Sequence, residues 1–80
     1  MSPSAAAEVA AHAGDDALTP RETDVLRFIA RGHANKEIAA LLSITEEGVK
    51  SRVRSILTKL RAGDRTHATV IGLKRGIIEL

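Results

Sequence analysis

The densest group of chemically active side chains in this sequence is a run of cations between residues 50 and 65. Six of these sixteen residues are Lys or Arg, and only Asp64 is acidic. A basic segment inside a folded unit is the electrostatic signature of a polyanionic partner. A charge run by itself is more often a solvated helix face, so the surrounding pattern must decide between the two interpretations. The six cations are Lys50, Arg52, Arg54, Lys59, Arg61 and Arg65.

The apolar residues in the same region follow the spacing of one helix face. Steps of 4, 3, 1 and 3 residues separate Val49, Val53, Ile56, Leu57 and Leu60, which predicts a helix over 46–60 with its apolar stripe against a core. The opposite face of that helix carries hydrogen-bonding and charged groups that can contact base edges in the major groove of DNA. These are Glu47, Lys50, Ser51, Arg54 and Thr58.

Catalytic and metal chemistry find no support in the sequence. It contains no Cys, and His12, His33 and His67 do not stand at metal-ligand spacing. Neither a nucleophile–base pair nor a glycine-rich phosphate loop is recognisable. We therefore expect no enzyme, no metal and no cofactor. His67 is expected to cap or pack a helix instead.

The composition indicates one small domain built on aliphatic side chains. The chain has 80 residues, and its aromatic content is 1%. No run approaches the roughly 20 apolar residues that span a bilayer, and the N-terminus lacks a signal-peptide pattern. The expected location is cytoplasmic, in association with the nucleoid.

Charge divides the chain into two parts. Residues 1–17 hold three acidic residues and no Lys or Arg, whereas residues 18–80 hold 12 cations against seven acids, so 12 − 7 = +5. The first part is rich in Ala and has no sustained apolar stripe. We interpret 1–17 as a flexible tail or interdomain linker, and 18–80 as the folded domain.

The folded part begins with a dense helix-start signal. Thr19 can cap the first helix, Pro20 tolerates the first helical position, and Glu22 completes a capping box. Gly32 is suited to the left-handed conformation that ends a helix. These signals predict a first helix over 20–31.

Two further helices complete the predicted fold. One covers 35–42 and buries Ile38, Ala39, Leu41 and Leu42; a corner at 43–45 follows, where Thr45 can cap the helix over 46–60. The last covers 66–75 and places Ala68, Ile71 and Gly72 toward the core. Its outer stripe is unusually apolar for a monomer, which predicts a second buried surface. That stripe is Thr69, Val70 and Leu73.

Several short groups of residues between 18 and 78 stand in a characteristic order and spacing. They are Leu18-Thr19-Pro20-Arg21-Glu22, Val25-Leu26, Gly32, Asn35-Lys36-Glu37-Ile38-Ala39, Val49-Lys50, Leu57, Lys59-Leu60, Asp64-Arg65-Thr66 and Ala68.

In these groups the sequence resembles the C-terminal domain of LuxR/NarL/FixJ-type regulators, including the sporulation regulator GerE. The resemblance implies an all-α, four-helix domain with a helix-turn-helix, in which the helix over 46–60 lies in the major groove. It also implies a dimer on two half-sites, paired through the helix over 66–75 at Thr69, Val70 and Leu73. Many relatives are two-component response regulators, so this chain is expected to be an effector domain of that kind.

The partners expected from this resemblance are double-stranded DNA and a second copy of the chain, weakly paired without DNA. RNA polymerase is a further candidate, and a membrane is not expected. The candidate DNA-contact residues are Lys36, Thr45, Glu47, Val49, Lys50, Ser51, Arg52 and Arg54.

Three positions depart from the usual pattern of the family. Ala34 stands where Ser or Thr is usual and cannot cap, so Asn35 is expected to take over. Gly48 replaces Thr, which weakens the helix but permits closer approach to DNA. Arg52 replaces His and adds a permanent charge.

Two other functions fit parts of the pattern. A helix-turn-helix can serve only for protein contact with the transcription machinery, and the basic face of 46–60 argues against this use. A nonspecific DNA-coating protein would show steep salt dependence with almost no sequence preference.

Overall fold

Four helices make up the regular structure in the computed structural model, which describes residues 17–80. They are α2 (Pro20–Ala30), α3 (Asn35–Leu42), α4 (Glu46–Leu60) and α5 (Arg65–Lys74), with no strand in that range. The expected all-α class is confirmed. The tail or linker predicted for 1–17 lies outside the described residues, apart from Ala17. None of the described helices is long and apolar enough to cross a membrane.

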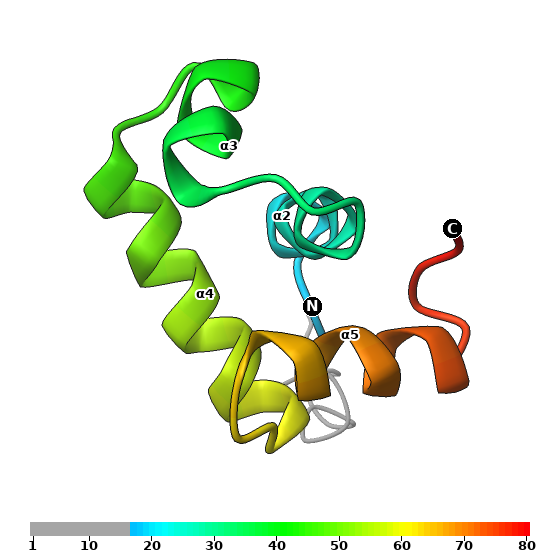
Figure 1. Ribbon diagram of the computed structural model, residues 1–80. Helices are drawn as coiled ribbons and strands as arrows, with labels where there is room; N and C mark the ends of the chain where they lie inside the picture. Colours follow the sequence, from blue (N-terminus) through cyan, green and yellow to red (C-terminus); the bar gives the residue numbers. More distant parts are fainter. Residues whose placement is uncertain (1–16) are drawn as a thin grey trace, which may run out of the picture.

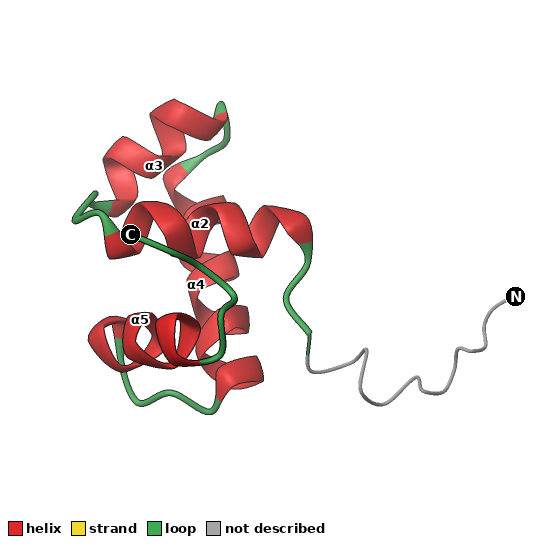
Figure 2. Cartoon of the chain, turned by 90° about the vertical axis from the view of Figure 1, so that its right-hand side faces the viewer, coloured by secondary structure: helices red, strands yellow, loops and turns green. Residues whose placement is uncertain are grey.

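The longest helix, α4, forms one side of the molecule, and the others pack on it (Figure 1). The N-terminal end of α4 lies beside α3, and its C-terminal end lies beside α5. Between them runs α2, which packs against both α4 and α5. Figure 2 shows the same order from the side, with α2 between α3 and α5. The packing of α3 is mainly against α4, so α3 depends on α4 for its position.

Local capping explains where most of these helices begin. The Thr19 hydroxyl accepts from the Glu22 N–H at 3.1 Å, and the Glu22 carboxylate accepts from the Thr19 N–H at 2.9 Å, so the predicted capping box is present. Thr45 caps α4 by accepting from the Gly48 N–H at 2.9 Å, as expected. Each cap satisfies a backbone donor that the first helical turn leaves free.

The start of α3 differs from the prediction. Ala34 is the N-cap residue and has no side-chain acceptor, but Asn35 does not replace it. Instead the carboxylate of Glu37 accepts from the Ala34 N–H at 2.8 Å, which is one half of a capping box. The Asn35 side chain is engaged elsewhere, with Arg65.

Three helix bounds are shifted by one residue from the predicted bounds. The first helix ends at Ala30 rather than at residue 31, because the backbone of Arg31 has left helical geometry. The last begins at Arg65 rather than at residue 66, since Asp64 is the N-cap and accepts from the His67 N–H at 2.8 Å. That helix also ends at Lys74 rather than at residue 75, because Arg75 is its C-cap. The Nδ1 atom of His67 in turn accepts from the Gly63 N–H at 3.1 Å, so its predicted capping role is confirmed.

The turns after α3 and α4 use left-handed residues that are not glycine. Ser43 has φ 57° and Arg61 has φ 55°. Such a conformation is disfavoured for residues with a Cβ and persists when the surrounding structure fixes it. Gly32 has positive φ as well, in agreement with its expected role at a helix end, and so does Gly76.

The core is aliphatic and is shared by all four helices and the C-terminal segment. Its ten buried residues come mainly from the predicted stripes, and burial of each Val, Leu or Ile side chain contributes roughly 1.5–3 kcal/mol. They are Val25, Leu26, Ile38, Ala39, Val49, Val53, Ile56, Leu60, Ala68 and Ile78.

Leu41 does not belong to this core, contrary to the prediction. Its side chain is 54% exposed. The buried residues of α3 are the adjacent Ile38 and Ala39, because this short helix has only α4 as a substantial packing partner. A stripe that is apolar by sequence is therefore wider than the surface that α4 covers.

Gly72 allows α5 to approach α2 closely. A Cβ atom at this position would lie 2.9 Å from the Leu26 Cδ2 atom and 3.1 Å from the Ile78 Cγ1 atom. Both neighbours are buried, so neither can move freely. The short distance between the helices thus explains why a glycine stands at this position of α5.

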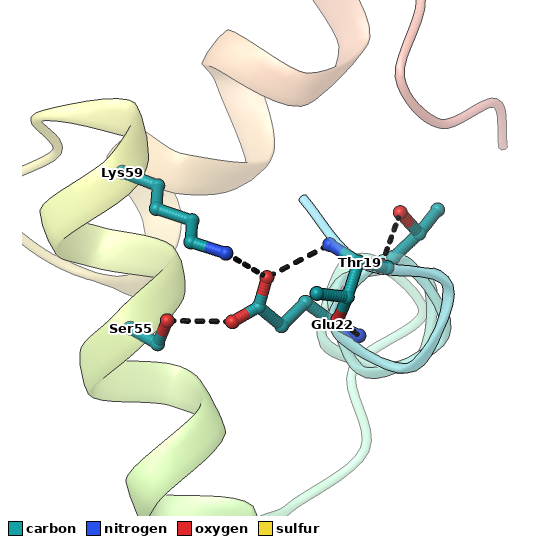
Figure 3. A network of polar contacts seen from close by, with 5 residues as sticks. Thr19, Glu22, Ser55 and Lys59 are labelled. Atoms are coloured by element: carbon teal, nitrogen blue, oxygen red, sulfur yellow. Dashed lines mark hydrogen bonds and ion pairs between the residues drawn. The ribbon is translucent and has the colours of Figure 1, made fainter. Parts of the chain in front are cut away.

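A buried carboxylate connects the first helix to α4 (Figure 3). The Glu22 side chain is one of the least exposed charged groups, and its Oε2 atom accepts from the Ser55 hydroxyl at 2.5 Å. Its Oε1 atom accepts from the Lys59 Nζ at 2.8 Å, as well as from the Thr19 N–H. The capping residue of α2 therefore also forms an ion pair with α4.

These contacts hold the pKa of Glu22 at about 2, well below the ordinary value. Burial alone would raise the pKa, because it disfavours the charged form. The hydrogen bonds from Lys59, Ser55 and the Thr19 backbone, with the charge of Lys59, outweigh burial and favour the carboxylate. The folded state thus binds a proton at Glu22 more weakly than the unfolded chain does.

This difference makes the stability of the domain sensitive to acid. The stabilisation from Glu22 is complete above the unfolded pKa of about 4.3 and is lost as the pH falls toward 2. A shift of this size corresponds to about 3 kcal/mol. We expect Glu22→Gln to lower the free energy of unfolding at pH 7 by about 2–3 kcal/mol, and the difference from the wild type to vanish near pH 2. Urea titrations between pH 2 and 7 measure both.

Glu37→Gln is a matched control, since Glu37 occupies the same N3 position in α3 but its side chain is 61% exposed. Its unfolding free energy should stay within about 0.5 kcal/mol of the wild type, as for most surface substitutions. An acid profile of Glu22→Gln parallel to that of the wild type would contradict the assigned role of the carboxylate.

Candidate nucleic-acid interface

The face of α4 opposite the core is a continuous polar surface. All five residues predicted for it are exposed, while Val53 and Ile56 on the other side are buried. The helix thus separates a packing face from a hydrogen-bonding face, as its sequence indicates. The exposed residues are Glu47, Lys50, Ser51, Arg54 and Thr58.

Two of these side chains meet at the N-terminal half of the helix. The Nζ of Lys50 lies 3.5 Å from the Glu47 Oε2 atom, and both groups are exposed. An ion pair of this kind contributes little to stability and is readily exchanged for another partner. Lys50 is therefore available to an acceptor from outside, and Glu47 reduces the net charge beside it.

The remaining polar candidates come from α3 and from the N-terminal half of α4 with its cap. Lys36 lies exposed in the first turn of α3, and Thr45 is exposed at the start of α4 with its hydroxyl in the cap. The side chain of Arg52 is half-buried and donates to the Gly48 carbonyl at 3.3 Å. Lys36 comes from a different helix, whereas the others share α4 or its cap.

Val49 cannot be a contact residue in this structure. It was included among the candidate DNA-contact residues, but its side chain is 0% exposed and belongs to the core. The helical period places it with Val53 and Ile56, on the side of α4 away from the polar face. This candidate is therefore wrong, and the substitution Val49→Ala would act on packing.

A groove of about 730 Å³ borders the polar face of α4 on the side of α5. Lys50 and Arg54 form one wall, and the turn before α5 together with its first residues forms the other. The apolar floor comes from Val53 and Leu57. The sequence indicated the first wall but gave no sign that the second lies beside it.

Arg65 also lines this groove, although its place in the basic run gave no sign of its partners. Its guanidinium donates to the Asn35 Oδ1 atom and, at 3.1 Å, to the His33 carbonyl. These contacts join the start of α5 to the start of α3, two helices that pack little against each other. The basic run between 50 and 65 contained this residue, but its partners stand 30 and 32 residues away.

The outer stripe of α5 is less uniform than the sequence suggested. Val70 is 42% exposed, but Leu73 is half-buried and packs in part against the core. Thr69 is half-buried too, and its hydroxyl donates to the Arg65 carbonyl at 3.1 Å. Val70 is thus the member of the predicted interface with the most free apolar surface.

Residues 17–80 contain no group of three or more His, Asp or Glu side chains that could hold a metal ion. The site that the structure brings together is instead a basic, hydrogen-bonding surface on one helix, with a basic groove beside it. Such a surface suits an extended polyanion better than a small substrate.

Comparison with known proteins gives matches over the part of the chain that contains α2, α3 and α4 and most of α5. The sequence pattern of the luxR family of bacterial regulatory proteins matches residues 16–71. The chain is 53% identical over 57 residues to an uncharacterized transcriptional regulatory protein, YhcZ, of Bacillus subtilis, a match that covers 71% of this chain and 27% of that protein. It is 54% identical over 56 residues to a nitrate/nitrite response regulator protein homolog of Haemophilus influenzae, covering 70% and 27%.

A third relative is the response regulator protein VraR of Staphylococcus aureus, 42% identical over 62 residues. That match covers 78% of this chain and 30% of VraR. The matched part of this chain thus spans less than a third of the length of each of these relatives.

Gly48 offers a direct test of the local structure of α4. A Cβ here would lie 3.1 Å from the Thr45 Oγ1 atom, so the cap must shift by a few tenths of an ångström. At the start of α2, Glu22 holds the equivalent position and has a Cβ, and its cap bond is 3.1 Å rather than 2.9 Å. We expect Gly48→Ala to raise the free energy of unfolding by up to about 1 kcal/mol, because Gly is a poor helix former.

Thermal and urea unfolding measure this gain, with Thr45→Ala and the double variant as controls. In the Thr45→Ala background the hydroxyl that lies nearest the new Cβ is absent. The gain in unfolding free energy from Gly48→Ala should therefore be at least as large in that background. A loss of stability in both backgrounds would show that α4 does not tolerate a side chain at this position. A gain in stability with a loss of DNA affinity would assign Gly48 to close approach of the helix to DNA.

Proposed function

The chain belongs to the luxR family of bacterial regulatory proteins, and we propose that residues 18–80 bind DNA in a sequence-specific manner to regulate transcription. The single observation that supports this most is the exposed polar face of α4. Lys50, Ser51 and Arg54 on that face offer donors to base edges, and the buried opposite face fixes the helix to the core.

In the proposed complex, α4 lies in the major groove and α3 crosses the phosphate backbone, as in other helix-turn-helix proteins. Lys50 and Arg54 contact base edges. Lys36, exposed at the start of α3, contacts a phosphate, and Arg52 adds a cation at the edge of the helix. The Thr45 hydroxyl stays in the cap of α4 and orders the helix end that enters the groove.

We further propose that this domain is the effector part of a longer two-component response regulator. Two of the relatives are named as response regulators, and the chain matches about 27–30% of their length. In such a protein the remaining length would carry the input, and the domain would supply the DNA contact. Operator sequence and direction of regulation belong to that whole protein.

Contact with RNA polymerase alone is the alternative function. A protein-contact surface does not need the exposed basic side chains that α4 presents. The alternative predicts no salt-dependent binding to duplex DNA, whereas counterion release makes true DNA binding fall steeply with salt. Fluorescence anisotropy on a labelled duplex at several salt concentrations separates the two.

Substitutions on the polar face test the assigned contacts. We expect Lys50→Ala and Arg54→Ala each to weaken binding to a duplex selected from random DNA by about 1–3 kcal/mol, the range for a good base contact. Binding to unrelated DNA should change less, because nonspecific affinity comes from phosphates. Anisotropy titrations on both duplexes give the two values.

Lys74→Ala and Arg75→Ala are the matched controls, since each removes the same charge from the exposed C-terminal end of α5. They should keep the preference for the selected duplex. If Lys50→Ala and Arg54→Ala bind both duplexes as the wild type does, α4 does not contact the bases.

The proposed complex contains two copies of the domain on two half-sites, paired through α5. Val70 with part of Leu73 offers one or two helical turns of apolar surface per copy. An interface of that size falls below the roughly 1,200 Å² of stable complexes. The free domain should therefore be monomeric or weakly dimeric, and half-sites should lie about one turn of DNA apart.

Val70→Glu tests this pairing, and it is preferable to a change at Leu73, which also packs on the core. Two like charges would face each other across the two-fold axis. We expect normal folding and near-normal binding to a single half-site, but loss of cooperative binding to two half-sites. Gel-shift titrations on both duplexes measure the cooperativity factor.

Leu41→Glu is the control, because Leu41 is another exposed apolar residue on a different helix. The ratio of two-site to one-site affinity cancels any effect of its charge on DNA contact, so this ratio should remain at the wild-type value. Unchanged cooperativity in Val70→Glu would remove α5 from the interface.

A further inference from the structure

The groove between α4 and α5 has two walls of different origin. On one side stand Lys50 and Arg54 of the polar face; on the other stand Arg65 and Thr66 at the start of α5. Asn35, from the start of α3, also lines the groove. The groove therefore brings the proposed base-contacting side chains close to residues that have no assigned function.

Its charge favours an anionic occupant. Three cations line the groove, and Asp64 is its one acidic group. An oxygen of that carboxylate is already engaged by the His67 N–H at 2.8 Å, which holds it in the cap of α5. A net positive groove beside an apolar floor attracts a phosphate more strongly than the exposed helix face alone would.

Arg65 is held in place before any ligand arrives. Its two bonds, to the Asn35 side chain and the His33 carbonyl, use two of the five N–H groups of a guanidinium. The planar group keeps its charge and further donors for another acceptor. Because its side chain is half-buried and already ordered, little conformational freedom remains to be lost on binding.

We propose that this groove binds a backbone phosphate of the DNA duplex, with Arg65 as the main ligand and the exposed Thr66 hydroxyl as a second donor. The inference rests on the proposed function. A helix in the major groove has a sugar-phosphate backbone on each side. When Lys50 and Arg54 contact base edges, the wall formed by α5 faces one of these backbones.

The simpler explanation is that Arg65 only ties α5 to α3. That role would lower stability and affinity together when the residue is changed, but it would not alter the number of phosphates neutralised. The slope of the logarithm of the binding constant against the logarithm of salt concentration reports that number, at about 0.9 per phosphate on duplex DNA. The slope therefore distinguishes a ligand from a structural tie.

The experiment measures this slope by anisotropy with the selected duplex for the wild type and four variants. Arg65→Gln should reduce the magnitude of the slope by about 0.9 and weaken binding to every sequence alike. Arg75→Gln removes the same charge from the other end of α5 and should keep the wild-type slope. Asn35→Ala and Arg65→Lys, which disturb the ties but keep the cation, should keep the slope even where affinity falls.

An unchanged slope in a folded Arg65→Gln would overturn the proposal and leave Arg65 as a structural tie. Should that variant fail to fold by circular dichroism, Thr66→Val decides, because Thr66 is exposed and takes no part in the ties. It should weaken binding to all sequences by about ten- to a hundredfold, the range for one hydrogen bond to a charged group. Wild-type affinity in Thr66→Val would then count against the groove.

Failure of the proposed function gives a different result. If the wild type itself shows no salt-dependent binding to any duplex, the DNA-binding role is wrong. If the wild type binds and Lys50→Ala loses its preference while Arg65→Gln keeps the slope, only the groove proposal is wrong.

Discussion

The buried carboxylate of Glu22 is the interaction on which the arrangement of the helices depends most. It completes the capping box of α2 and accepts hydrogen bonds from Ser55 and Lys59 on α4. A charge in this position is tolerated because every oxygen has partners and a cation lies beside it; removal of one partner would leave a costly buried charge. The network also has directional geometry, which hydrophobic packing lacks. It therefore helps to fix the rotation of α4, and with it the direction in which the polar face points.

The core imposes the second constraint. Each turn of α4 has one or two residues buried in the core. Val49 is one of them, so the need for buried residues extends into the half of the helix nearest the proposed DNA contact. The side chains left for recognition are those on a narrow exposed stripe. Because the domain is small and has few layers, its binding site is a helix surface with a groove beside it rather than an enclosed pocket. Such a surface fits a long, regular polyanion.

The small size of the domain also explains why single polar ties matter. Helix α3 packs mainly on α4, and the Asn35–Arg65 contact gives its first turn a second point of attachment. Capping by Asp64 and His67 fixes the turn that carries Arg65. A helix-turn-helix needs a fixed angle between its two helices to contact the backbone and the bases together. In this chain, side chains outside the motif help to hold that angle.

Local signals in the sequence determined the helices and the polar face. The caps at Thr19 and Thr45, the glycines that end helices and the 3.6-residue spacing act within a few positions, so they could be predicted without a structure. Ion pairing between Glu22 and Lys59, and the bond from Arg65 to Asn35, join residues 37 and 30 positions apart. Exposure of Leu41 likewise follows from which helix surfaces meet. The tertiary structure alone decided these features, because the angles at which helices pack depend on the whole core and not on any local pattern.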